Sequence, residues 1–242
     1  MFLETFPVGP IQANCVLIGD REAGVLAIID PGEEAARIIE RVEASGLEPT
    51  MVLHTHGHLD HAGGTADLVR RLPDGIPVGL HRDELQLYQG LVMQGRMFGL
   101  EVEEPPMPDL WLEHGQELSL GGLRLEVRYT PGHSPGSVTW TWESCALNTC
   151  YDVVYADSMS PVSAQGFSFA ATGAADQIIE SAGIIGNLDC DILLSPHPFF
   201  FGMYDKLERR DEGNPFVNSF ACTFYAESSL DWLEQRLKAE GG

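Results

Sequence analysis

The amino-acid sequence predicts an α/β fold whose functional groups lie on loops that follow strands. Short apolar runs rich in Val, Ile and Leu recur along the chain and end at Gly, Pro or Asp, which is typical of strands. Between these runs, apolar residues recur at helical spacing, as Ala35, Ile38 and Val42 do in residues 33–45. A hydrophobic fraction of 44% over 242 residues supports a globular core of ordinary size.

The expected strands share an apolar or alternating pattern and a turn signal at one end. Residues 2–9 and 14–19 form a pair around Gly9-Pro10, and residues 123–129 alternate apolar with polar residues as a half-buried strand does. In chain order, we expect strands over residues 2–9, 14–19, 25–29, 51–53, 77–80, 117–120, 123–129, 138–142, 153–156 and 191–195.

The expected helices are recognised by their spacing and by the residues that start or stop them. Gly46 stops the first helix and Pro73 the second. Asn214-Pro215 supplies an N-cap and a first helical residue for the last helix, which has an apolar face from Val217 to Leu237. In chain order, we expect helices over residues 33–45, 65–72, 83–98 and 176–185, and a last one that begins at 214.

The chain is strongly acidic, with 14 basic against 36 acidic residues and a net charge of −22. Nucleic acids require clustered Lys and Arg, and the basic pairs are limited to Arg70-Arg71 and Arg209-Arg210, so we expect no nucleic-acid partner. No stretch approaches the roughly 20 apolar residues of a membrane span, so we expect no membrane partner. We expect a small-molecule substrate and a monomer.

One short stretch, Thr55 to His61, holds three histidines and one aspartate within six residues. Imidazole and carboxylate are ligands that zinc prefers. A strand would turn His61 away from the others, and a helix would turn His58 away. A loop after the apolar strand end at Val52-Leu53 can instead aim His56 and His58 at one ion, and Asp60 and His61 at a neighbouring one.

The pattern His-x-His-x-Asp-His after an apolar strand resembles the metallo-β-lactamase fold superfamily. The resemblance spans the whole chain and implies an αββα four-layer sandwich, with metals in loops at one edge of the sheets. It implies a single metallo-hydrolase domain over residues 1–242. His58 stands where the di-iron flavoprotein branch has Glu, which argues against that branch. β-Lactamases, glyoxalase II-like thioesterases, lactonases and RNA-processing nucleases share the pattern.

The two parts of the chain resemble different branches. Residues 143–242 resemble the third subclass of metallo-β-lactamases, in the runs Tyr155 to Ser163 and Cys190 to Pro198. Residues 1–140 resemble glyoxalase II-like hydrolases, in the run Gly9 to Cys15. Both lysines also lie in the last 102 residues. A mosaic of two parents joined near residues 140–143 would explain these differences.

We expect two zinc ions per chain, with iron or manganese as alternatives. His133 taken alone reads as a surface-loop residue, but Thr130 to Ser137 resembles the next metal motif of the superfamily. The expected ligands are His56, His58 and His133 for one ion, and Asp60, His61 and His197 for the other. Three protein ligands leave an open position, as in catalytic zinc sites, for a hydroxide shared by the two ions. Asp60 is the expected catalytic residue, which orients that hydroxide and carries a proton.

The roles of three further residues follow from the resemblance. Asp157 bridges the metals if the chain acts like glyoxalase II, and is not a ligand if it acts like the third β-lactamase subclass. Ser158 and Ser160 match hydroxyls that lie near the substrate carboxylate in that subclass, with loop capping as the alternative. His54 precedes the motif and is expected to be a core residue or to support a ligand.

The resemblance also implies two disulfides, Cys190 with Cys222 and Cys145 with Cys150, with buried thiols of a cytosolic enzyme as the alternative. Paired cysteines would indicate a periplasmic or secreted protein. Met1 to Glu4 lacks the charged and apolar regions of a signal peptide, so the chain as written reads as cytoplasmic.

Two activities fit these residues. The first is a β-lactamase, in which a metal-bound hydroxide attacks the lactam carbonyl. The alternative is a thioester or lactone hydrolase of the glyoxalase II type that uses the same dinuclear site.

Overall fold

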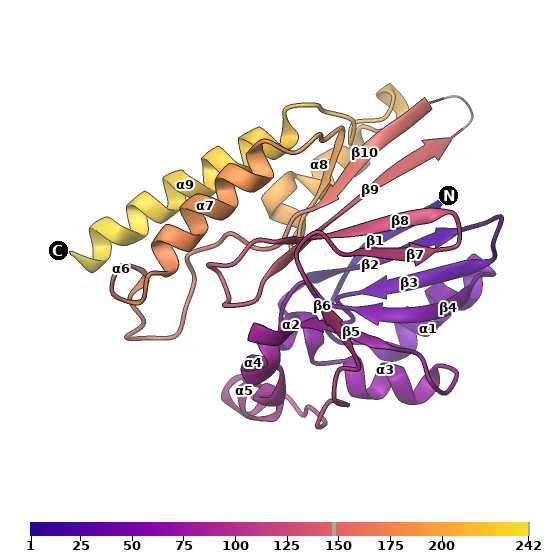
Figure 1. The fold of residues 1–242 in the computed structure, drawn as a ribbon, viewed down its shortest axis with the longest axis horizontal. Coiled ribbons are helices and arrows are strands. Elements are labelled where there is room, and N and C mark those ends of the chain that lie inside the picture. Colours follow the sequence, from indigo (N-terminus) through magenta and orange to yellow (C-terminus); the bar gives the residue numbers. More distant parts are fainter. Residues whose placement is uncertain (147–148, 242) are drawn as a thin grey trace.

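The computed structural model describes residues 1–146 and 149–241, and places two β-sheets face to face with helices on their outer sides (Figure 1). The six-stranded sheet has the order β1-β2-β3-β4-β5-β6, and the five-stranded sheet the order β11-β10-β9-β8-β7. This architecture confirms the predicted αββα sandwich.

The elements have the following bounds. The strands are β1 (Phe2–Val8), β2 (Ala13–Asp20), β3 (Val25–Ile29), β4 (Glu48–Leu53), β5 (Val78–His81), β6 (Leu110–Leu112), β7 (Glu117–Leu120), β8 (Leu123–Tyr129), β9 (Val138–Ala146), β10 (Thr149–Tyr155) and β11 (Ile192–Leu194). The helices are α1 (Ala35–Ser45), α2 (Leu59–Ala62), α3 (Thr65–Arg71), α4 (Leu85–Gln89), α5 (Leu91–Phe98), α6 (Phe169–Thr172), α7 (Ala174–Gly186), α8 (Met203–Glu208) and α9 (Ala221–Glu240). Short 3₁₀ turns are η1 (Arg82–Glu84), η2 (Pro198–Phe201) and η3 (Arg210–Glu212).

Parallel pairing brings the segments after β3, β4, β10 and β11 to one edge of the sandwich. Strands β3, β4, β5 and β6 run parallel, so β3 and β4 finish side by side at Ile29 and Leu53. In the other sheet β10 and β11 are parallel and finish at Tyr155 and Leu194. The segments that follow these ends therefore gather at one edge of the sandwich.

The core follows the two-residue period of the strands. In β2, Val16 and Ile18 join the apolar cluster between the sheets, whereas Cys15 and Leu17 join the cluster that contains α1 and α3. Strand β2 is buried on both faces, which explains its continuous apolar sequence.

Helices α7 and α9 lie side by side along the five-stranded sheet (Figure 1). Ile178 and Ile185 of α7, and Tyr225 and Leu233 of α9, are buried in the cluster that also contains the strands of this sheet. None of the described helices is long and apolar enough to cross a membrane.

Two helix predictions were wrong in their bounds. Residues 83–98 form η1, α4 and α5 rather than one helix, because the chain leaves α4 at Gly90, a residue with low helix propensity. The last helix begins at Ala221, not at 214. The Asn214 side chain accepts a hydrogen bond from the Phe216 N–H at 3.2 Å and closes a turn, while Val217 forms a β-bridge with Ile192. These contacts hold the segment in turns on either side of the bridging Val217 until the helix starts.

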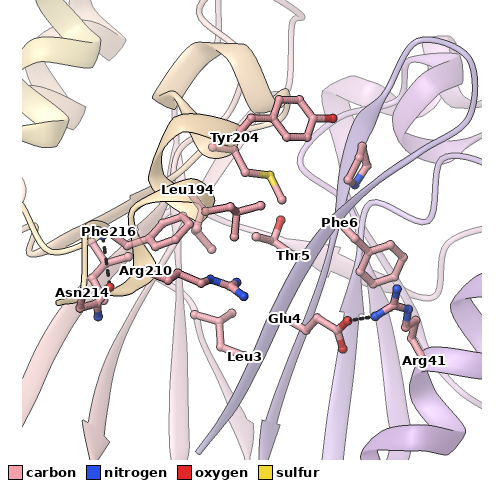
Figure 2. A pocket seen from close by; sticks show the side chains of 14 residues that line it. Leu3, Glu4, Thr5, Phe6, Arg41, Leu194, Tyr204, Arg210, Asn214 and Phe216 are labelled. Carbon is pink, nitrogen blue, oxygen red and sulfur yellow. Dashed lines mark hydrogen bonds and ion pairs between the residues drawn. The ribbon is translucent and has the colours of Figure 1, made fainter. Parts of the chain in front are cut away.

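A cavity of about 570 Å³ opens where β1 and β11 face the segment from α8 onward (Figure 2). Leu3, Leu194 and Phe216 give it apolar walls, and Arg41 and Arg210 are among its polar lining residues. No histidine lines this cavity, so it is separate from the loops that carry His56 to His61, His133 and His197.

Candidate metal centre

The loop after β4 carries His56 and His58 and leads directly into the short helix α2, which carries Asp60 and His61. Leu53 ends β4, His58 precedes the first turn of α2, and Asp60 and His61 belong to that turn. His133 arrives on the loop between β8 and β9, and His197 on the segment after β11. The structure thus brings all six predicted ligands to one edge. They form two triads, His56-His58-His133 and Asp60-His61-His197, and the ligand atoms of each triad lie within 4.8 Å of one another.

The three-histidine triad has the geometry of a cation site. His58 Nδ1 lies 3.1 Å from His133 Nε2, although the two residues are 75 positions apart in the chain. His56 Nε2 is buried without a hydrogen-bond partner among the described residues. A buried nitrogen without a partner is costly, and a cation held by all three nitrogens would satisfy it.

Hydrogen bonds on the outer nitrogens orient two of these rings. His56 Nδ1 donates to Asp157 Oδ1 at 2.9 Å, and His133 Nδ1 donates to the Ser160 carbonyl at 2.9 Å. With Nδ1 protonated in both rings, the lone pair of Nε2 faces the centre of the triad.

The second triad combines a carboxylate with two imidazoles. Asp60 Oδ2 lies 3.5 Å from His61 Nε2 and 3.4 Å from His197 Nε2. The outer nitrogen of His61 bonds Asp30 Oδ2 at 3.0 Å, and that of His197 faces the Gln12 carbonyl at 3.3 Å. Both rings therefore present Nε2 to Asp60, which fits a divalent cation with mixed nitrogen and oxygen ligands.

Burial sets the protonation of these groups. It lowers the pKa of His56 and of His58 well below the usual range, and that of His197 to about 4. Burial alone would also lower the pKa of His61, but the carboxylates of Asp60 and Asp30 outweigh it and raise that pKa. Neutral imidazoles are the form that binds a metal, so three of these four rings are ready as ligands at neutral pH.

Asp30 supports this site and was not predicted from the sequence, in which it only follows the strand expected over residues 25–29. Its side chain is fully buried and accepts from the Thr55 N–H at 2.7 Å, the Thr55 hydroxyl at 2.7 Å and the Tyr155 hydroxyl at 2.8 Å, besides His61. Its φ of 54° is left-handed. A carboxylate at the end of a fully apolar strand was the signal that could have found it.

Glu84 was missed as well. It lies in η1 after β5, is fully buried, and accepts hydrogen bonds from Gly57 N at 2.6 Å, Gly136 N at 2.5 Å and Ser134 Oγ at 2.6 Å. Burial raises the pKa of Glu84 to about 7, against the opposing effect of these three donors. The sequence places Glu84 in the first turn of the helix expected over residues 83–98, where an acidic residue is ordinary and indicates no buried role.

The remaining predicted residues take three different positions. Asp157 is fully buried behind the His56 ring. The hydroxyls of Ser158 and Ser160 lie 2.9 Å apart, and Ser160 Oγ lies 3.2 Å from His133 Nδ1. Both nitrogens of His54 are engaged, by the Gly79 carbonyl and the Thr65 hydroxyl, so this ring is a core residue and offers no free ligand atom.

The cysteines pair as the resemblance implies. Cys190 is bonded to Cys222 and Cys145 to Cys150, with Cα–Cα distances of 6.2 Å and 4.0 Å. Cys15 is a buried free thiol in β2. The first disulfide ties the start of α9 to the segment that leads into β11 and His197.

Comparison with known proteins places this geometry in one family. The family model described as "Metallo-beta-lactamase superfamily" matches residues 8–197. The hydroxyacylglutathione hydrolase GloC of Haemophilus influenzae is 32% identical over 223 residues, which cover 90% of this chain and 99% of that protein. The probable metallo-hydrolase YqgX of Bacillus subtilis is 40% identical over 152 residues, or 62% of this chain and 69% of its own.

Solved structures show the same fold over nearly the whole chain. The Rm3 metallo-β-lactamase superposes with a TM-score of 0.86 at 32% identity and covers 98% of this chain and 92% of its own. MEM-A1, a subclass B3 metallo-β-lactamase isolated from a soil metagenome library, superposes with a TM-score of 0.82 at 29% identity, over 95% and 90%. GloC and Rm3 each match this chain on both sides of residues 140–143. Neither match tests whether the two parts have different parents, so the mosaic stays a prediction. The chain belongs to the metallo-β-lactamase superfamily.

Proposed function

We propose that this chain is a dinuclear zinc hydrolase that opens the β-lactam ring. The observation that carries this proposal is the position of Asp157, whose Oδ1 is 2.9 Å from the outer nitrogen of His56. A carboxylate that bridged two metals would face both triads, whereas Asp157 Oδ1 bonds the outer nitrogen of one ring of a single triad. This is the arrangement expected of the third β-lactamase subclass rather than of glyoxalase II.

The six candidate ligands would hold two ions, and Asp60 would have a second role in the reaction. When bound, a pair of zinc ions would polarise a carbonyl and lower the pKa of a bound water towards ~7. His56, His58 and His133 would hold one ion beside the carbonyl, and Asp60, His61 and His197 the other. Neighbouring imidazoles, His61 foremost, hold the pKa of Asp60 below its usual range, so this side chain stays ionised. It can therefore accept a hydrogen bond from the attacking water and orient it between the triads.

The serines next to the three-histidine triad would orient the substrate. The Ser160 hydroxyl lies beside His133 and lines a small hollow of about 50 Å³ together with Ser228 and Ser229. Hydroxyl groups here can donate to the carboxylate that a β-lactam carries on its fused ring. Such an anchor would place the lactam carbonyl over the three histidines.

The comparisons support this choice of substrate at the level of the whole chain. Rm3 and MEM-A1, which are metallo-β-lactamases by name, each cover at least 95% of it. The two disulfides support an oxidising compartment such as the periplasm or the exterior. We further propose that residues 1–242 act as one metallo-hydrolase domain and as a monomer.

A thioester hydrolase is the second candidate. GloC, a hydroxyacylglutathione hydrolase by name, matches this chain over 99% of its own length. This match supports a thioester hydrolase as the alternative. In this case Asp157 would have to turn from His56 towards both metals. A lactone hydrolase would need the same machinery.

Measuring nitrocefin and S-lactoylglutathione hydrolysis side by side with zinc-loaded protein separates the two candidates. The proposal predicts nitrocefin turnover that a chelator abolishes and that added zinc restores. Thioester turnover together with an inert panel of penicillins, cephalosporins and carbapenems would overturn it. His197→Ala is the matched control, because it removes one ligand and should lower either activity.

A further inference from the structure

Glu84 lies outside both triads and yet contacts the loops that carry one of them. It follows β5 in the 3₁₀ turn η1, and its side chain is fully buried. A buried carboxylate must be matched by donors, and Glu84 has three. Oε2 accepts from Gly57 N at 2.6 Å, while Oε1 accepts from Ser134 Oγ at 2.6 Å and from Gly136 N at 2.5 Å.

The three donors belong to two different loops. Gly57 stands between His56 and His58, and Ser134 follows His133 directly. One carboxylate therefore spans the loop after β4 and the loop between β8 and β9, which supply the three histidines. These loops are about 75 residues apart in sequence, as are the His58 and His133 nitrogens that approach to 3.1 Å.

Two glycines make this close approach feasible. A Cβ at Gly57 would lie 2.9 Å from Tyr88 N and 3.2 Å from Glu84 Oε2. A Cβ at Gly136 would lie 2.8 Å from Glu84 N and 3.0 Å from Glu84 Cγ. A side chain at either position would push the backbone N–H away from the carboxylate, so both positions are fitted to Glu84.

We propose that Glu84 is a positioning residue for the three-histidine site, holding the His56-His58 loop and the His133 loop at the separation that a metal ion requires. The inference rests on the metal-dependent function proposed above. It is specific to one triad, because the rings of the Asp60-His61-His197 triad have other partners: Asp30 Oδ2 lies 3.0 Å from His61 Nδ1, and the Gln12 carbonyl lies 3.3 Å from His197 Nδ1. Loss of Glu84 should therefore weaken one site more than the other.

The test measures Co²⁺ affinity in backgrounds that retain a single triad. His197→Ala disables the Asp60 triad and reports on the three histidines, and His133→Ala does the reverse. Glu84→Gln keeps the shape of the side chain, but its amide nitrogen cannot accept the hydrogen bonds that one carboxylate oxygen of Glu84 accepts. We expect it to weaken Co²⁺ binding about 10- to 100-fold in the His197→Ala background. In the His133→Ala background we expect a change of less than about threefold.

Tyr88→Phe is the matched control, because it alters a buried side chain four residues along without removing a hydrogen bond to either loop. It should leave both affinities unchanged. Gly136→Ala, which crowds the carboxylate from the opposite side, should reproduce the selective loss if Glu84→Gln does not fold. Equal losses in both backgrounds, or no loss in either, would overturn the role of Glu84. Absence of Co²⁺ binding by the unmodified chain would instead overturn the proposed function itself.

Discussion

At the residue scale, the site depends on which nitrogen of each histidine carries the proton. The outer nitrogens of His56, His61 and His133 are bound by Asp157, Asp30 and the Ser160 carbonyl, which leaves Nε2 as the ligand atom. His58 differs, because its Nδ1 is the atom that faces His133. Partners on the far side of a ligand therefore decide how the ligand points.

Asp157→Asn tests this at one residue. An amide oxygen can still accept from His56 Nδ1, but without the charge that strengthens the bond. We expect the variant to bind two zinc ions, with about tenfold weaker affinity at the three-histidine site and reduced nitrocefin turnover. Titration with zinc followed by elemental analysis measures this. Loss of the zinc at the Asp60 site would contradict the account, since it would mean that Asp157 bridges both ions.

The pKa shifts predict that the metal-free protein is sensitive to acid. His56, His58 and His197 have folded pKa values below 6.5, whereas in the unfolded chain they bind protons near that value. Between pH 6.5 and about 4, the unfolded state therefore holds more protons at these positions, and the free energy of unfolding falls as pH falls. His61 has a raised pKa, so its effect lies above pH 6.5 and does not oppose this slope. Glu84 and Asp157, whose pKa values burial raises, act in the opposite sense within the window, but they are two carboxyl groups against three imidazoles.

Urea unfolding of chelator-treated protein at pH 7, 6 and 5 measures this slope. Each fully shifted histidine contributes up to about 1.4 kcal/mol per pH unit within the window. Stability that stayed constant or rose on acidification would show that these rings are not held neutral in the folded state.

At the element scale, most strands were predictable, because burial leaves recognisable apolar runs, which are continuous in β2 and β3. The three-residue strand β6 was missed. The start of α9 was not predictable. Asn214-Pro215 has the sequence of a helix start, but the β-bridge between Val217 and Ile192 is a tertiary contact that local sequence does not encode. Likewise Gly90 divides residues 83–98, and Glu84 lies in the separate 3₁₀ turn η1 that precedes α4.

The disulfides stabilise two elements to different degrees. Cys190–Cys222 closes 32 residues and anchors α9, whereas Cys145–Cys150 closes five residues within the β9–β10 hairpin. Loop-closure entropy predicts a loss of about 3–4 kcal/mol when the first bond is removed and about 2 kcal/mol for the second. Urea unfolding of the Cys190→Ala/Cys222→Ala and Cys145→Ala/Cys150→Ala variants gives both values. The reverse ranking would contradict this assignment.

At the scale of the whole molecule, the site exists because parallel strands from two sheets end at one edge. The sequence could select the six side chains that the structure brings together at this edge. Four of them stand in the dense motif from His56 to His61, and His133 and His197 follow from the resemblance to the motifs of the superfamily. It could not predict Asp30 and Glu84, because a buried carboxylate that supports a loop looks the same in sequence as one in an exposed turn. Their roles depend on distances to residues far along the chain.

The central claim is that these loops hold two cations side by side. Anomalous diffraction from zinc-soaked crystals, recorded on both sides of the zinc absorption edge, tests it most directly. The account predicts two peaks per chain, one among His56, His58 and His133 and one among Asp60, His61 and His197, with the second lost in His197→Ala. A single peak, or zinc bound elsewhere while these six side chains stay unligated, would contradict it.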